Sequence, residues 1–154
     1  GRTSFLINTR RIGARPDYDC ASEIDESDCN SQRKTYSEID LALKYTQTEA
    51  DDEFGIFSAF ERDGKYYKGR NFQSIRYRKS LDDLRIGYLL TYVDRPNISR
   101  AAQVHTMDFD YSFDATSRFS GTLSYSNIDS ESTTTEGVAL RGRVARNFTE
   151  KFSN

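Results

Sequence analysis

The chain has 154 residues, with 22 basic and 24 acidic side chains and a formal net charge of −2. This balance offers no basic excess to a nucleic acid, so no nucleic-acid partner is predicted. No run of about 18 uncharged apolar residues occurs, which excludes membrane-spanning helices but not β-barrels, in which only alternate residues face lipid.

Apolar and polar residues alternate with a period of two from residue 35 onward, which is typical of strands with one apolar and one polar face. With an N-terminal run around Phe5 and Ile7, we count eight strands, and their short connections make consecutive strands antiparallel. Residues 1–154 are therefore predicted to be all-β: an antiparallel up-and-down meander of about eight strands, forming a transmembrane β-barrel or a segment of a larger one. The later runs span residues 39–45, 54–60, 73–78, 84–93, 106–113, 119–125 and 138–145.

The two phases of these strands differ in charge. On the apolar phase we find one charged residue, Arg146, near a strand end. A basic side chain facing lipid at mid-membrane costs about 2–4 kcal/mol, so this scarcity of charge favours a lipid-facing surface. A soluble barrel with an apolar interior would show the same alternation. The other phase would line the lumen, either as a solute-selective wall or as space-filling salt bridges, with Asp40, Lys44, Arg76, Arg78, Arg85, Asp108, Asp110, Arg141 and Arg143 as candidates.

Short and long connections are expected to alternate along the chain, as periplasmic turns and extracellular loops do in outer-membrane barrels. The short ones are predicted at residues 48–52, 80–83, 114–117 and 148–151, and the long ones at 16–34, 61–70, 94–101 and 127–136.

Aromatic residues of the apolar phase lie near both ends of the predicted strands, with aliphatic residues between them. Two such girdles are typical of residues at the two membrane interfaces. Ordinary aromatic residues of a sheet core are the alternative. The candidates are Tyr45, Phe54, Tyr77, Phe113, Phe119 and Phe148 near short turns, and Phe60, Tyr92 and Tyr125 near long loops.

The acidic loop at residues 16–34 holds both cysteines, Cys20 and Cys29. A disulfide between them is favoured over free thiols or a metal pair, and it would fit an oxidising compartment. Acidic loops can bind Ca²⁺, but the glycine and spacing of an EF-hand are missing, so no metal is predicted. His105 is the single histidine, and no nucleophile–base pair stands out; we predict no cofactor and no enzymatic activity.

At residues 5–16, an apolar run is followed by Arg-Arg-Ile-Gly at 10–13 and then by a proline. This stretch resembles a marker of the bacterial outer-membrane barrels catalogued as domain of unknown function 5916. Residues 73–95 are similar to that family's basic strand, turn and glycine-containing strand. The resemblance implies an interior slice of a larger barrel and carries over no functional residues. The acidic insert at 17–34 departs from the family's pattern.

The function predicted from these patterns is that of a bacterial outer-membrane β-barrel, a passive conduit or scaffold with a polar lumen and extracellular loops. Its partner would be the lipid bilayer, with other outer-membrane or surface proteins as further candidates. One alternative is a soluble eight-stranded barrel that binds a small apolar ligand, as lipocalins do. Another is a surface receptor or adhesin that acts through its loops.

Overall fold

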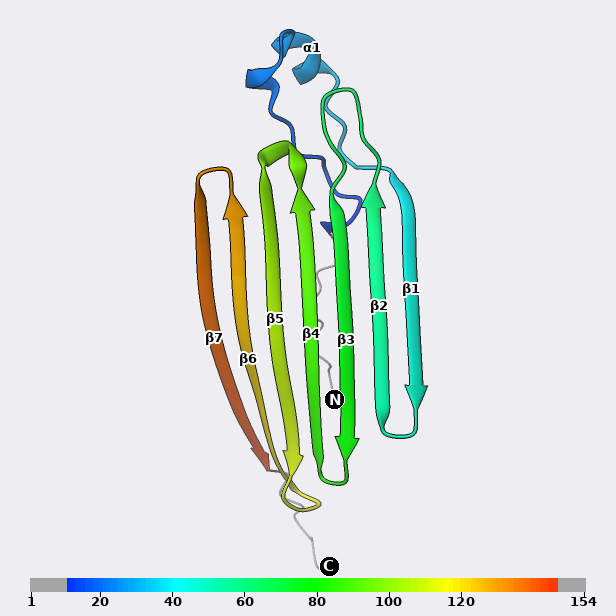
Figure 1. Cartoon of the computed structure of the whole chain (residues 1–154), viewed down its shortest axis with the longest axis vertical. Coiled ribbons are helices and arrows are strands. Elements are labelled where there is room, and N and C mark those ends of the chain that lie inside the picture. The colour runs from blue at the N-terminus through cyan, green and yellow to red at the C-terminus, as the bar shows by residue number, and fades with distance from the viewer. Residues whose placement is uncertain (1–10, 147–154) are drawn as a thin grey trace, which may run out of the picture.

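The computed structural model describes residues 11–146. Seven strands form one antiparallel sheet in which each strand pairs with its neighbours in sequence (Figure 1). The structure also contains the short helix α1 (Glu26–Ser31) and the 3₁₀ turns η2 (Cys20–Ser22) and η3 (Pro96–Ile98). The strands are β1 (Ile39–Glu49), β2 (Asp52–Glu61), β3 (Asn71–Leu81), β4 (Leu84–Arg95), β5 (Arg100–Ser112), β6 (Ser117–Ser130) and β7 (Thr133–Arg146).

Tight turns explain why consecutive strands pair. Two residues join β1 to β2, and two join β3 to β4. Ala50 and Asp82 begin these turns with φ of 47° and 42°. Positive φ at this position belongs to the hairpin turns whose twist matches that of the flanking strands. We call the end of the sheet that carries these turns the turn end. The opposite end, which carries residues 62–70 and η3, is the loop end.

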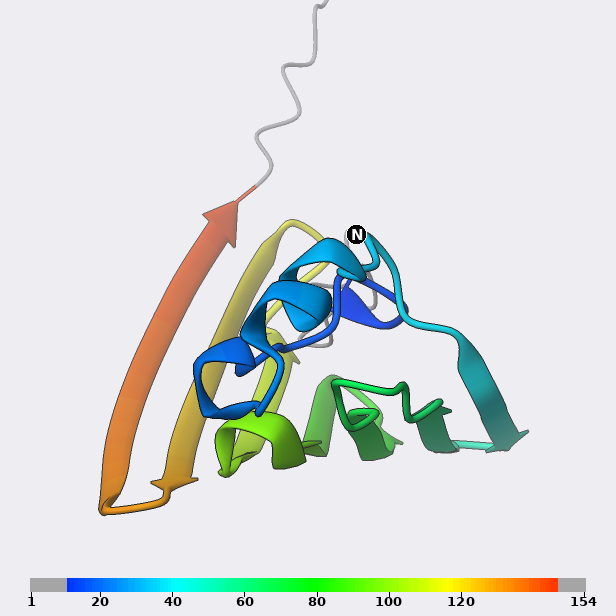
Figure 2. The same ribbon diagram turned by 90° about the horizontal axis from the view of Figure 1, so that it is seen from above.

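The sheet is strongly curved, and the segment before β1 lies inside the curve (Figure 2). We call residues 11–38 the cap. Glu61, Arg70 and Arg95 lie on the same face of the sheet and hydrogen-bond to cap residues. That face is therefore the concave one. The apolar phase of the strands forms the convex face.

The predicted number of eight strands is wrong for this structure, which has seven in one open sheet. The predicted strand around Phe5 and Ile7 lies outside the described residues. Because seven is odd, β1 and β7 run in the same direction, from the loop end to the turn end (Figure 1). Direct closure by these two strands would be parallel, and an all-antiparallel barrel cannot close in that way.

The predicted long loop at residues 127–136 is also wrong. β6 continues to Ser130 and β7 begins at Thr133, so two residues join them. The polarity of the stretch favours a loop, but Thr133, Thr134 and Thr135 are β-branched and extend the ladder. The connection predicted at 94–101 is similarly reduced to residues 96–99. No helix among the described residues is long and apolar enough to span a membrane.

Candidate functional site: the two faces of the sheet

A continuous apolar surface covers the convex face. The register places apolar side chains of adjacent strands side by side, as in the row formed by Tyr77, Tyr88, Met107, Leu123 and Leu140. Many of these side chains are exposed: Met107 is 61% and Leu123 47% accessible. Soluble monomers rarely leave so large a contiguous apolar surface uncovered.

Charged residues of the convex face lie only at its two ends. The strands extend beyond the alternating runs predicted from the sequence, so Arg146 is not the single charge of this phase. Asp52 and Lys79 form an ion pair of 3.3 Å at the turn end. Asp94, Asp129 and Glu136 lie at the loop end. The face is therefore an uncharged band between two charged rims.

Aromatic side chains border this band near both rims. Towards the turn end lie Tyr45, Phe54, Tyr77 and Phe119 on the strands, with Phe113 just beyond β5. Towards the loop end lie Phe60, Tyr92 and Tyr125. Tyr88 and Tyr111 belong to the same face and were missing from the predicted set. Phe148 lies outside the described residues.

His105 lies within the convex band, between Leu90 and Tyr125 of the neighbouring strands. Its Nδ1 is 2.6 Å from the hydroxyl of Tyr88, and its Nε2 is 2.6 Å from the side-chain amide of Gln103. Both ring nitrogens are thus engaged. The histidine belongs to a polar cluster on the apolar surface.

The concave face has two halves of different character. Near the loop end, inside the curve that holds the cap, Ala59 and Phe72 are buried opposite each other on β2 and β3. Leu89 is buried farther towards the turn end, opposite Arg76. Near the turn end the same face is charged. Eight of the predicted lumen residues lie on this face of the strands, Lys44 at its middle and the others towards the turn end: Arg76, Arg78, Arg85, Asp108, Asp110, Arg141 and Arg143.

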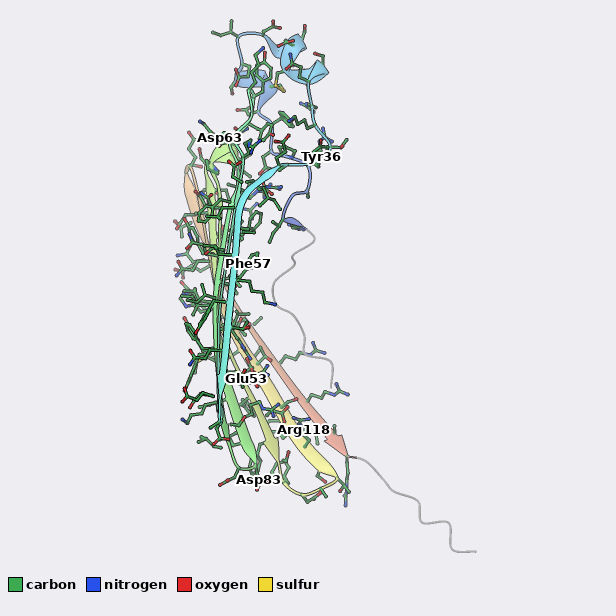
Figure 3. The ribbon with its side chains drawn as sticks, turned by 90° about the vertical axis from the view of Figure 1, so that its right-hand side faces the viewer. Tyr36, Glu53, Phe57, Asp63, Asp83 and Arg118 are labelled. Carbon is green, nitrogen blue, oxygen red and sulfur yellow. A yellow bond between two sulfur atoms is a disulfide. The ribbon has the colours of Figure 1, made fainter. Side chains whose placement is uncertain are left out.

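Three ion pairs join strands across the charged half. Arg78 contacts Glu53 at 3.3 Å, and Arg118 pairs with Asp110. Glu53 and Arg118, both labelled in Figure 3, were missing from the predicted set although both occupy the polar phase. Asp40 differs from the other candidates: it sits at a bulge in β1 and pairs with Arg62 of the loop after β2.

The third pair reaches over a whole strand. Arg76 of β3 binds Asp108 of β5 through two contacts, one of which is 2.9 Å, and β4 passes beneath them. This is possible because β4 carries Gly87 there. A Cβ at Gly87 would lie 2.6 Å from the guanidinium nitrogen and 2.8 Å from the carboxylate oxygen. A glycine inside a strand indicates a close approach of another group, so Gly87 is the sequence signal that could have pointed to this contact.

A buried ion pair fastens the cap to the concave face. The carboxylate of Glu61, whose side chain is 1% exposed, accepts hydrogen bonds from Arg70 Nε at 2.7 Å and from the backbone N–H of Gly13 at 2.8 Å. Arg70 also donates to the carbonyl of Ala14 at 2.9 Å. A second ion pair lies beside the pair of Glu61 and Arg70. Arg95 makes a bidentate contact with Asp17 that lowers the pKa of the Asp17 carboxyl group.

A disulfide holds the outer part of the cap. Cys20 and Cys29 are bonded, and both side chains are buried, with Cys29 completely inaccessible. The bond joins η2 to α1, which is only six residues long and would be marginal without such a support.

Replacing both Cys20 and Cys29 by serine is expected to loosen the cap without unfolding the sheet. The closed ring is short, and the chain-entropy model assigns such a cross-link about 3 kcal/mol. Amide hydrogen exchange of α1 should therefore accelerate by about a hundredfold, since each 1.4 kcal/mol corresponds to a factor of ten. Amides of β4 serve as the internal control. Equal acceleration in α1 and β4 would contradict a local role.

Asp28 links α1 to the loop between β2 and β3. Its carboxylate accepts hydrogen bonds from the hydroxyl of Tyr66, from Lys65 Nζ at 2.9 Å and from the Gln32 amide at 2.8 Å. These donors, the Tyr66 hydroxyl foremost, lower the pKa of Asp28 to about 2. Since its pKa falls on folding, the group stabilises the cap above about pH 4, and this contribution is lost as the pH falls towards 2.

Titration of the Asp28 carboxyl by ¹³C NMR is expected to show a midpoint of about 2. Replacing Tyr66 by phenylalanine removes the strongest donor and should raise this midpoint towards the ordinary aspartate value. Replacing Lys68 by methionine is the matched control, because Lys68 pairs with Asp63 instead. A midpoint near 4 in the unmodified protein would show that these contacts do not persist in solution.

No family model, no curated protein and no solved structure matches the chain.

Proposed function

We propose that this chain forms part of the wall of a bacterial outer-membrane β-barrel, with the convex face in contact with lipid and the concave face lining the interior. The barrel would serve as a passive conduit or scaffold, with the cap and loop end outside the cell. The resemblance at residues 10–13 to domain of unknown function 5916 agrees with this proposal. The uncharged convex band between two charged rims is the observation that carries it.

The dimensions of the band support a bilayer as its partner. On β4 the convex residues from Leu84 to Tyr92 are uncharged, and Asp94 begins the rim. Nine residues at about 3.4 Å each extend roughly 30 Å, and a tilt of about 35–45° reduces the height to about 21–25 Å. The apolar band of outer-membrane barrels is about 25 Å tall. The strands, with 10 to 14 residues, are long enough to span it.

The direction of curvature favours this function over a soluble ligand-binding barrel. In a lipocalin-like barrel the apolar phase would face inward and the charged phase would face water. Figure 2 shows the cap inside the curve. The residues that bind the cap lie on the same face of the sheet as the charged residues, so the charged phase also faces inward. A disulfide in the cap agrees with an oxidising, extracytoplasmic compartment.

Single tryptophan reporters test both the membrane and the orientation, because the chain contains no tryptophan of its own. Tyr45 on the convex face and Phe57 on the concave face lie on adjacent strands and are both aromatic. In vesicles containing brominated phosphatidylcholine, Tyr45→Trp fluorescence is expected to be quenched strongly. Phe57→Trp should be quenched weakly by the bromolipid and more readily by aqueous acrylamide.

Flotation of the same samples with the vesicles provides the second readout. A chain that stays monomeric without detergent and does not float would contradict the membrane assignment. Stronger lipid quenching at position 57 than at position 45 would contradict the proposed orientation.

A further inference from the structure

The edge strands β1 and β7 have the fewest backbone hydrogen-bond partners in the sheet. β1 and β7 each have one neighbouring strand, so one side of each backbone has no ladder partner among the described residues. The exposure of the β7 side chains reflects this. Val138, Leu140 and Val144 are 73%, 81% and 75% accessible, compared with 47% for Leu123 on the adjacent strand. In lipid such an edge is costly, because unpaired backbone groups find no water there.

Charge is also unbalanced at the β7 edge. Within residues 11–146, Arg141 and Arg143 have no carboxylate within ion-pair distance. The nearest acidic residues in their rows are Asp108 and Asp110, which are already paired with Arg76 and Arg118. β6, which lies between them, carries Thr122 and Ser120 at these positions.

We infer that β7 binds an antiparallel strand of defined chemistry: apolar on the phase beside Val138, Leu140 and Val144, and acidic beside Arg141 and Arg143. Inside the sheet, Arg118 finds its carboxylate one strand away and Arg76 finds its carboxylate two strands away, whereas Arg85 donates to the hydroxyl of Ser80. Arg141 and Arg143 can form pairs like those of Arg76 and Arg118 if the next strand supplies the acids. This inference rests on the proposed function, in which the sheet is one part of a closed wall.

Other occupants fit less well. The β1 edge of a second copy in the same orientation would run parallel to β7, and its central concave residue, Lys44, is basic like the arginines it would meet. The β7 edge of an inverted second copy would be antiparallel but, in the register centred on Gly142, would bring Arg141 and Arg143 against the same two residues. Like charges at cross-strand positions are destabilising. The complementary strand is therefore an acidic one.

Peptide binding to the full chain in detergent micelles tests the inference. The probe is a labelled 13-residue peptide with valine and tyrosine on one phase, threonine on the other, and two neighbouring threonines of that phase replaced by glutamate. A second peptide carries lysine in place of both glutamates. The glutamate peptide is expected to bind at least about tenfold more tightly, since two cross-strand ion pairs replace two repulsions.

Reversing the charges of Arg141 and Arg143 provides the decisive test. The variant R141E/R143E should reverse the preference and favour the lysine peptide. The matched control is R15E/R100E, which changes the net charge equally but alters two arginines of the loop end. Among residues 11–146, neither has a carboxylate within ion-pair distance. This control should keep the original preference for the glutamate peptide.

Backbone pairing is separated from simple anion binding by N-methylating alternate amides of the glutamate peptide. A strand partner should then lose binding, whereas a bound anion would not require the amides. Retained binding after methylation, competition by millimolar inorganic phosphate, or no preference between the two peptides would each overturn the inference. Flotation with vesicles is scored on the same preparations. Protein that floats but ignores the peptides contradicts this inference alone, and protein that does not float contradicts the proposed function.

Discussion

Replacing Leu123 by arginine is expected to lower the free energy of unfolding in a bilayer by about 2–4 kcal/mol, the cost of a basic side chain at mid-membrane. Leu123 lies in the middle of the convex band, next to Met107 and Leu140, and is 47% exposed. Urea unfolding in phosphatidylcholine vesicles, followed by tyrosine fluorescence, measures the change. The effect should be much smaller than 2 kcal/mol only if this face meets water.

Thr122 provides the matched control because it precedes Leu123 and faces the concave side, between Asp108 and Arg141. Thr122→Arg adds the same side chain away from lipid, with the carboxylate of Asp108 on one side and the guanidinium of Arg141 on the other. We expect it to change stability by less than about 1 kcal/mol, in the range of exposed ion pairs. Equal losses in the two variants would contradict the assignment of lipid to the convex face.

Replacing Glu61 by glutamine is expected to destabilise the protein by about 3–5 kcal/mol, the cost of leaving one partner of a buried ion pair without its counter-charge. Arg70 is 9% exposed and would retain its charge beneath the cap. The N–H of Gly13 would also lose its carboxylate acceptor. Urea unfolding measures the global loss, and hydrogen exchange around Gly13 measures release of the cap.

Glu38→Gln is the control for this prediction. Glu38 forms ion pairs with Lys34 and Arg62, but its side chain is 40% exposed, so its loss should destabilise the protein far less than the loss of Glu61. The double variant Glu61→Leu/Arg70→Met should be less destabilised than the sum of its single variants, since it leaves no buried charge. Additive losses would mean that the two groups are solvated independently.

Much of the sheet could be predicted from the sequence because the faces of a strand alternate strictly. The run from Leu84 to Val93 gave both the position of β4 and its two faces. The same rule placed Arg76, Asp108 and Arg141 on one face without knowledge of the register. Strand ends were harder to predict, since Thr133 and its neighbours are polar on both phases and carry no alternation.

The attachment of the cap could not be read from the sequence. Glu61 and Arg70 lie at opposite ends of a loop, and their partners Gly13 and Ala14 are about fifty residues away in sequence. In the sequence, Glu61 and Arg70 look like ordinary residues of a polar loop. Only the folded backbone brings them together, so the buried charges that fix the loop end are visible only in three dimensions.

The bridge from Arg76 to Asp108 also decides how the strands beneath it can align. If β4 slid by two residues against β3 and β5, Leu89 or Arg85 would replace Gly87 and force the bridge apart. Such a slip would keep every apolar side chain on the convex face, so hydrophobicity alone would not prevent it. Gly87 therefore helps to fix the register of β4. The Arg76–Asp108 bridge can form in the observed alignment, but not after a shift of two residues, which the alternation of apolar and polar residues would allow.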